Sequence, residues 1–246
     1  MAYNWRWEVF LEPVPTGEDT YLGWLIAGLR TTVMVASGAW IIALAVGSVM
    51  GVLRTVPNRI LYGIATVYVE VFRNIPLLVQ LFIWYFVVPD LMPERAGLWV
   101  KGLNPFLQLF FAAMACLAFF TGARVCEQVR AGINSLARGQ RAAALAMGLT
   151  LPQAYRYVLV PAAFRIIVPP LTSEILNIFK NSAVASTIGL LELAAQGRQL
   201  VEYTAQAYES FIAVTLLYLL LNFVILALMR VVEARSRVPG FIGARK

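Results

Sequence analysis

Charge and histidine are what this sequence has least of. Only 13% of its 246 residues are charged and 60% are hydrophobic, whereas an average soluble domain carries about 25% charged residues. This composition excludes an ordinary soluble protein and predicts an integral membrane protein. Histidine is absent altogether, which removes the most common metal ligand and the usual proton shuttle, so we expect no metal site.

Cysteine and N-terminal basic residues are also scarce. Cys116 and Cys126 lie ten positions apart on one predicted helix, or roughly 15 Å, so they cannot pair with each other, and their spacing matches no metal site. Residues 1–22 hold four acidic side chains against the single Arg6, the reverse of a signal peptide. We expect the first hydrophobic helix to remain in place as the insertion signal.

Long apolar runs take the place of the missing charge. A helix that spans a bilayer needs about 20 apolar residues, and three uncharged runs reach that length: 31–53, 102–123 and 210–229. Two more, 60–89 and 157–179, are interrupted by charge and proline. The sequence predicts an all-α membrane protein with five transmembrane helices, built as one domain over residues 1–246. Residues 183–195 are too short to span and are expected to be interfacial or re-entrant.

Lys and Arg are unevenly distributed over the connections between these runs. Alternate connections hold twelve in one set (54, 59, 124, 130, 138, 141, 156, 230, 235, 237, 245, 246) and five in the other (6, 95, 101, 180, 198). Cytoplasmic loops are the richer in basic residues, so we expect the N-terminus outside and the C-terminus inside. The net charge of +7 is then a membrane-orientation bias and not a nucleic-acid-binding surface.

The connection between the third and fourth runs contains an alanine-rich segment, residues 139–152. Alanine is the smallest strong helix former, Gly148 can end a helix in the left-handed conformation, and Pro152 suits the first turn of a second helix. The sequence thus predicts a cytoplasmic helix–glycine–helix that a soluble partner can approach closely.

This segment resembles the "EAA" sequence signature of the membrane subunits of ABC importers, E-A-A-x3-G-x9-I-x-L-P. The matching positions are Ala142, Ala143, Ala144, Gly148 and Pro161. The resemblance implies a type I ABC importer permease fold, with a coupling helix that inserts into a cleft of the ATP-hydrolysing subunit. A membrane-surface helix is the alternative, but an alanine-rich helix lacks the large apolar residues that anchoring needs.

One position departs from the signature. Ala142 stands where the signature has glutamate, beside Arg141. A polar contact made by that glutamate is therefore absent or supplied differently, and we expect the contacts at the small residues and Gly148 to be mainly steric.

A second block resembles the polar amino-acid permeases. Residues 68–80 read Y-V-E-V-F-R-N-I-P-L-L-V-Q, against the family run Y-x-E-x-F-R-x-x-P-L-x-V-Q. Within that group, residues 54–59, 123–130 and 179–182 resemble the glutamate/aspartate importer permeases. The resemblance covers nearly the whole chain and implies import of glutamate and aspartate across a bacterial inner membrane. Glutamine or basic amino acids are the alternative substrates.

Glu70, Arg73 and Gln80 from this block are candidates for the substrate pathway. Glu70 and Arg73 share one helical face inside an apolar run, where charge is costly and suggests function. They can pair with each other, in a structural or gating role, or contact substrate. Pro76 between them and Gln80 predicts a kink that helps to form a gate or cavity.

The fourth run supplies the other pathway candidates, Lys180, Asn181 and Ser182. Its paired prolines, Pro169-Pro170, free backbone carbonyls, and a helix broken at the membrane midplane is a common substrate site in transporters. An acidic substrate needs cationic donors, for which Lys180 and Arg73 are suited, with neutral hydrogen bonds from Asn181 and Ser182. Lys180 can equally be an interfacial lysine at a helix end.

Other polar and aromatic residues have simpler interpretations. Glu174 is expected to pair with Arg165 or a neighbouring helix, and Asn222 to bond across a helix interface. The outer-side aromatic residues are expected to form a membrane-interface belt and not a ligand cage; they are Trp5, Trp7, Trp24, Trp84, Tyr85 and Trp99.

These observations and the resemblance lead to one functional hypothesis, a transport subunit without enzymatic activity. The sequence has no G-x-x-x-x-G-K-[ST] loop, so ATP is expected to be hydrolysed by a partner subunit and no cofactor to bind this chain. A second homologous permease subunit and a periplasmic amino-acid-binding protein are the other expected partners, besides membrane lipid. The alternative from another class is an ion-driven secondary transporter, which needs a titratable or sodium-binding group that the three clean runs lack.

Overall fold

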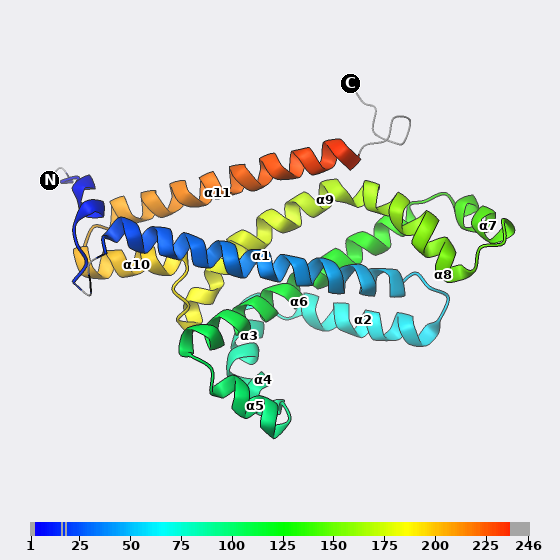
Figure 1. Cartoon of the computed structure of the whole chain (residues 1–246), viewed down its shortest axis with the longest axis horizontal. Helices are drawn as coiled ribbons and strands as arrows, with labels where there is room; N and C mark the ends of the chain where they lie inside the picture. The colour runs from blue at the N-terminus through cyan, green and yellow to red at the C-terminus, as the bar shows by residue number, and fades with distance from the viewer. Residues whose placement is uncertain (1–2, 16, 18, 237–246) are drawn as a thin grey trace. The chain divides into compact units, whose positions relative to one another are not determined.

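The computed structural model describes residues 3–15, 17 and 19–236, and long helices dominate it (Figure 1). Four stretches are long and apolar enough to cross a membrane: α1 (Tyr21–Leu53), α6 (Pro105–Asn134), the run Leu151–Ile188 and α11 (Ala207–Ser236). A fifth candidate is the bent pair made of α2 (Arg59–Asn74) and residues Leu77–Leu91. The all-α membrane architecture is confirmed. Glu18, Arg237, Arg245 and Lys246, used above in the charge argument, lie outside the described residues.

The remaining elements either make up the stretches Leu77–Leu91 and Leu151–Ile188 or lie before or between the stretches. They are the 3-10 helices η1 (Trp7–Leu11) and η4 (Ser182–Ile188), the π segments η2 (Ile83–Val87) and η3 (Tyr155–Leu159), and the helices α3 (Leu77–Phe82), α4 (Val88–Leu91), α5 (Glu94–Lys101), α7 (Arg138–Ala146), α8 (Leu151–Ala154), α9 (Val160–Asn181) and α10 (Leu193–Thr204). A single isolated β-bridge joins Pro13 and Thr20 among the described residues.

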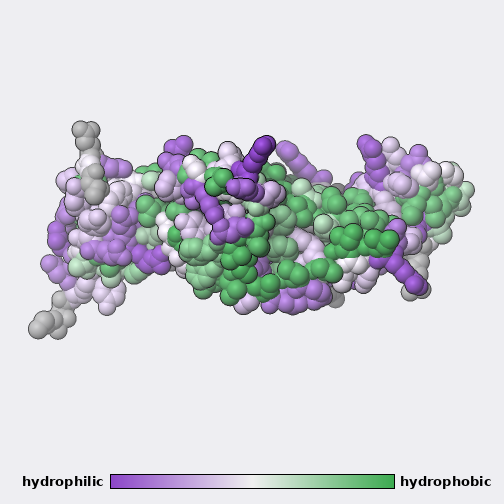
Figure 2. All heavy atoms as spheres, turned by 90° about the horizontal axis from the view of Figure 1, so that it is seen from below, coloured by the Kyte–Doolittle hydropathy of each residue, from purple (hydrophilic) through white to green (hydrophobic). Residues whose placement is uncertain are grey.

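The chain forms two compact units. The first lies within Met1–Trp40, Pro76–Leu117 and Asn177–Phe223, and the second within Ile41–Ile75, Ala118–Leu176 and Val224–Lys246. Each of α1, α6, α9 and α11 therefore contributes residues to both units. Hydrophobic side chains cover much of the face shown in Figure 2, as expected of helices that meet lipid or partner helices.

Two helices extend beyond the apolar runs from which they were predicted. α1 begins at Tyr21, before Arg30, and α6 continues beyond residue 123 to Asn134. The predicted helices were ended at charged residues. α6 accommodates its charged residues because Glu127 pairs with Arg54 and Arg130. Charge marks where a run stops being apolar and not where the helix stops.

The predicted kink at Pro76 is confirmed. Ile75 and Pro76 are both extended, with ψ of 130° and 139°, because proline disfavours the helical conformation of the residue before it. The two helical pieces on either side are bent by 106°. The second apolar run is therefore a broken span or a re-entrant element.

The break expected in the fourth run is wrong. α9 continues through Pro169 and Pro170 to Asn181. The irregularity of this run lies earlier, in η3, where the N–H of Val160 donates to the Tyr155 carbonyl five residues back. η2 has the same pattern, with Val88 donating to Ile83. Each π segment precedes a proline, Pro161 or Pro89, whose ring would clash with the carbonyl four residues back in a regular α-helix.

Residues 183–195 form two elements rather than one interfacial segment. η4 ends at Gly189, whose φ of +99° reverses the chain, and α10 starts at Leu193. Glycine is suited to this position because it adopts positive φ without a steric cost.

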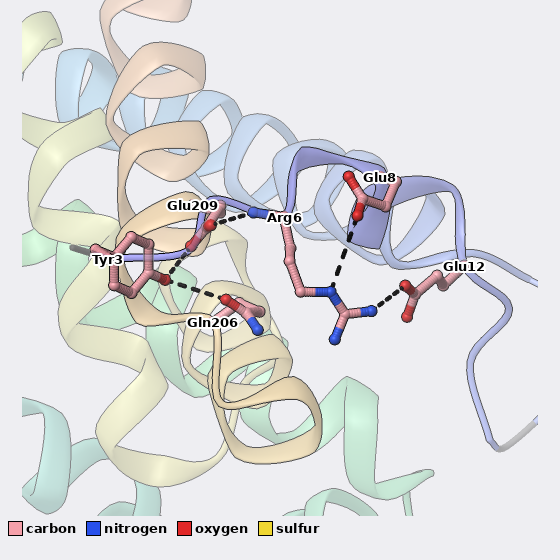
Figure 3. A network of polar contacts seen from close by, with 6 residues as sticks. All are labelled: Tyr3, Arg6, Glu8, Glu12, Gln206 and Glu209. Carbon is pink, nitrogen blue, oxygen red and sulfur yellow. Dashed lines mark hydrogen bonds and ion pairs between the residues drawn. The ribbon is translucent and has the colours of Figure 1, made fainter. Parts of the chain in front are cut away.

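A polar network holds the N-terminal segment to the start of α11 in the first unit (Figure 3). The buried Glu209 carboxylate accepts hydrogen bonds from the Tyr3 hydroxyl at 2.5 Å and from the Arg6 backbone N–H at 2.7 Å. Tyr3 also donates to Gln206, and Arg6 forms an ion pair with Glu12 at 2.8 Å. The segment before α1 is thus an ordered part of the unit.

This network predicts an alkaline transition at the N-terminus. The hydrogen bond to the Glu209 carboxylate, aided by desolvation, raises the pKa of Tyr3 from 10.0 to about 12. The bond therefore stabilises the folded segment fully below pH 10.0 and is lost as the pH rises towards about 12. The tyrosinate absorbance difference between the wild type and Tyr3→Phe should develop only in that alkaline window. Glu209→Gln should move it to lower pH, and an unchanged titration in that variant would contradict the assignment.

Candidate coupling loop and substrate pathway

The alanine-rich segment forms the predicted helix–glycine–helix. α7 ends with a Schellman motif in which the N–H of Gly148 donates to the Leu145 carbonyl and the N–H of Leu149 to the Ala144 carbonyl. Gly148 has φ of +85°, a conformation that non-glycine residues rarely adopt. The turn therefore depends on glycine at position 148.

The second helix of the loop, α8, has a defined start. The side-chain oxygen of Gln153 accepts hydrogen bonds from the backbone N–H of Thr150 at 2.8 Å and from its hydroxyl at 2.9 Å. Pro152 lies in the first turn, where its missing N–H leaves no helical bond unmade. Local rules fix both ends of the turn between α7 and α8.

The surface of the loop is less smooth than its alanines suggest. Ala142 and Ala143 are exposed and Ala144 is buried. Leu145 and Met147 are 40% and 74% exposed, so large apolar side chains stand beside Gly148. A Cβ at Gly148 would meet nothing within 4 Å. Within this chain the glycine is needed for its backbone conformation and not for space.

α6, which precedes the loop, and η3, which follows it, both contact the turn after α1, and sequence analysis missed these contacts. The buried Tyr155 hydroxyl donates to the Thr55 carbonyl at 2.7 Å. Arg54 and Glu127 form an ion pair in which the Arg54 side chain is 9% exposed. Pro161, the last residue of the matched pattern, is exposed in the first turn of α9.

Glu70 and Arg73 are exposed on α2, in the second unit. Of the two possibilities stated for them, the mutual pair is not formed here, and Glu70 instead accepts a hydrogen bond from the Asn74 side chain at 2.7 Å. Asn74 lies one helical turn after Glu70, a spacing that favours such a bond. The Arg73 side chain lies on the open surface of the unit.

Glu174 pairs with a neighbouring helix, as one of the two expectations stated. Its carboxylate accepts a hydrogen bond from Gln128 of α6 at 3.1 Å and lies 4.0 Å from Arg124. The alternative partner, Arg165, is not among the ion pairs of the described residues. All three interacting groups belong to the second unit.

The remaining pathway candidates lie in the first unit. Gln80 is 3% exposed on α3, which packs against η4. Asn181, the last residue of α9, lies beside Leu77 and Leu81 of α3. Gln80 and Asn181 therefore belong to elements that pack against each other. Because Glu70 and Arg73 belong to the other unit, the structure gathers the candidates into two separate groups.

Lys180 and Ser182 differ in exposure although they are close in sequence. Lys180 is exposed in the last turn of α9. Ser182 is fully buried, and its hydroxyl donates to the Phe179 carbonyl at 2.8 Å. The Ser182 hydroxyl thus gives a partner to a carbonyl at the end of α9, while the Lys180 ammonium is exposed to solutes or lipid.

Sequence analysis also missed a buried carboxylate, Glu192. It caps α10 by accepting hydrogen bonds from the N–H groups of Ala194 and Ala195 at 3.0 and 2.8 Å. The Tyr218 hydroxyl donates to it at 2.8 Å and the Thr32 hydroxyl at 3.4 Å. One side chain thus joins α1, α10 and α11 within the first unit.

The other sequence-based expectations have mixed outcomes. The Asn222 side chain donates to the Tyr218 carbonyl of its own helix at 2.7 Å, and the bond expected across a helix interface stays a prediction. Both cysteines are free, as predicted. Trp84, Tyr85 and Trp99 line an apolar cavity of about 450 Å³ in the first unit.

Comparisons with known proteins agree with this architecture. Residues 43–238 match the family of binding-protein-dependent transport system inner membrane components. The chain is 57% identical to the glutamate/aspartate import permease protein GltJ of Escherichia coli (strain K12), over all of both chains. It is 34% identical to the probable glutamine ABC transporter permease protein GlnM of Bacillus subtilis (strain 168), covering 79% of this chain and 82% of that one.

A solved structure shows the same fold. An amino acid ABC transporter with histidines matches with a TM-score of 0.72 and 31% identity, over 87% of this chain and 95% of that chain. The predicted type I ABC importer permease fold is consistent with that neighbour. The chain belongs to the family of inner membrane components of binding-protein-dependent transport systems: it is a multi-pass amino-acid ABC importer permease, a transport subunit and not an enzyme.

Proposed function

We propose that this permease imports glutamate and aspartate. Identity of 57% over the full length of a glutamate/aspartate import permease supports this substrate class above the glutamine class, for which the identity shown above is 34%. The chain serves as one membrane domain of five spans over residues 1–246, with α2 and Leu77–Leu91 counted as one span. The N-terminus lies outside and the C-terminus inside, in accord with the distribution of basic residues.

The ATPase subunit docks on residues 139–152, at Ala142, Ala143, Ala144 and Gly148, with Pro161 fixing the helix that follows. The observation that carries this proposal is the exposed α7–Gly148–α8 turn with Leu145 and Met147 projecting beside it. An alanine at position 142 offers no charge, so contact is made through shape and apolar burial. ATP is bound and hydrolysed by the ATPase, and this chain holds no cofactor.

Two further partners complete the transporter. A second homologous permease faces this subunit and forms the other half of the pathway, and a periplasmic amino-acid-binding protein delivers substrate on the outer side. Closure of the ATPases on ATP moves the coupling loops and shifts the permease pair between inward- and outward-facing states. In this scheme ATP biases a two-state equilibrium, because it binds one state more tightly.

The substrate pathway is lined by Arg73 and Lys180 as cationic groups, with Glu70, Gln80, Asn181 and Ser182 as its polar neighbours. The exposure of Arg73 and Lys180 supports this role, since both side chains are open on the surface of their own unit. Their positive charge matches the side-chain carboxylate that distinguishes glutamate and aspartate from glutamine.

Competition uptake tests both the substrate and the two cations. Cells with the complete transporter should take up labelled glutamate, and aspartate should compete far better than glutamine or arginine. Arg73→Ala or Lys180→Ala should reduce acidic-substrate uptake about tenfold, the effect of one lost charge-assisted hydrogen bond. Arg95→Ala, an exposed basic residue outside the pathway set, is the matched control. Competition by glutamine equal to that by aspartate would refute the acidic class, and equal losses for all substrates would refute contact with the side-chain carboxylate.

A further inference from the structure

The helix before the coupling loop (residues 139–152) and the π segment after it contact two consecutive residues, Arg54 and Thr55, in the turn after α1. Before the loop, Glu127 of α6 forms an ion pair with Arg54 and accepts two hydrogen bonds from Arg130, at 3.1 and 2.8 Å. After the loop, the Tyr155 hydroxyl donates to the Thr55 carbonyl at 2.7 Å. All of these groups lie in the second unit.

The hydrogen bond between Tyr155 and Thr55 gives a partner to both a buried hydroxyl donor and a carbonyl acceptor at a helix end. Carbonyl groups at the end of a helix lack intrahelical partners, and Thr55 follows α1 by two residues. Tyr155 is 6% exposed, and a buried phenol hydroxyl requires an acceptor. Because the acceptor is a backbone carbonyl, this bond does not depend on the side chain at position 55. The Thr55 hydroxyl itself donates to the Val52 carbonyl.

The end of α1 is itself packed tightly on α6. A Cβ at Gly47 would lie 2.6 Å from the Gly122 carbonyl oxygen, and one at Gly51 would lie 2.8 Å from the Cys126 carbonyl oxygen. Small residues at such spacing let two membrane helices approach backbone to backbone. The ends of α1 and α6 therefore form a close-packed pair, which cannot bend locally without losing these contacts.

We propose that Tyr155 is a positioning residue that transmits displacement of the coupling loop to the paired ends of α1 and α6. The inference rests on the proposed docking of the ATPase on residues 139–152. When the loop is displaced, the Tyr155 hydroxyl carries the Thr55 end of α1 with it, while the ion pair between Glu127 and Arg54 ties α6 to the same turn. Without the hydroxyl the loop moves and the ATPase works, but less of the movement reaches the spans.

The test is Tyr155→Phe in the complete transporter, reconstituted in liposomes with its ATPase subunit and binding protein. The readout is substrate moved per ATP hydrolysed, which a change in the amount of folded protein does not alter. We expect this ratio to fall about three- to tenfold, the range that one buried hydrogen bond corresponds to, with ATPase co-purification unchanged. Tyr157→Phe is the matched control, since that side chain lies in the same π segment and is 62% exposed.

A second variant and a cross-link make the outcome decisive. If Tyr155→Phe does not assemble, Glu127→Gln weakens the ion pair with Arg54 and should lower the same ratio. A wild-type ratio in whichever of the two variants assembles overturns the proposal. A Met147→Cys variant, in an otherwise unchanged chain, should cross-link to the ATPase. Absence of that cross-link refutes the docking proposal itself and is thereby distinguished from a failure of the Tyr155 link.

Discussion

Gly148→Val is expected to reduce both ATPase co-purification and substrate uptake by about tenfold. Valine at the φ of +85° found at Gly148 is strained by about 1–2 kcal/mol, because its Cβ crowds the following carbonyl. Since 1.4 kcal/mol corresponds to a factor of ten, the native turn would become a minor conformation. Loss of the turn would release the Leu145 and Ala144 carbonyls that the Schellman motif satisfies, and α8 would no longer be held at its angle to α7.

Two substitutions separate backbone conformation from side-chain size at this turn. Gly148→Asn should retain most activity, because asparagine tolerates the left-handed region. Gly139→Val changes another glycine of the loop with nothing within 4 Å of its added Cβ and with φ outside the positive range, so it should have little effect on ATPase binding. Co-purification and uptake at wild-type levels in Gly148→Val would mean that docking does not depend on this turn.

Glu192→Ala is expected to destabilise the subunit by about 3 kcal/mol. It removes the cap of α10, worth about 0.5–2 kcal/mol, and takes the carboxylate acceptor from the part-buried Tyr218 hydroxyl, at a further cost of about 1–3 kcal/mol. In a chain of this size that loss lowers the thermal midpoint by roughly 6–12 °C. The melting of purified subunits in detergent, followed by tryptophan fluorescence, measures the shift.

The controls for this prediction lie on the same helix. Glu202→Ala changes an exposed glutamate of α10 and should shift the midpoint by only about 1–2 °C, as surface substitutions usually do. Glu192→Gln keeps an acceptor oxygen for the helix N–H groups and should lie between the two. A melting temperature of Glu192→Ala equal to that of Glu202→Ala would show that the network around Glu192 does not stabilise the unit.

The features that sequence analysis predicted correctly are those set by local rules. The α7–Gly148–α8 turn follows from helix propensity, a left-handed glycine and a first-turn proline, all within fifteen residues. The bend at Pro76 follows from the steric restriction that proline imposes on Ile75. Neither feature requires knowledge of a distant partner, and both appear in the structure where they were expected.

The features that failed depend on partners that the sequence does not reveal. Glu127 pairs with Arg54 and Arg130, so α6 continues past residue 123, where charge alone suggested its end. Asn222 bonds within its own helix, to the Tyr218 carbonyl one turn back. The substrate candidates were chosen by residue type and position in the sequence, and their division between two units could not be predicted without the fold.

The π segments change how the sequence of two spans must be read. A π segment holds one residue more than α geometry allows, and each residue of an α-helix advances about 100° around the axis. Residues before Tyr155 are therefore out of phase with those after Leu159 by about one position, and the same holds across η2. A helical wheel drawn straight through either segment assigns the wrong face to half of the helix.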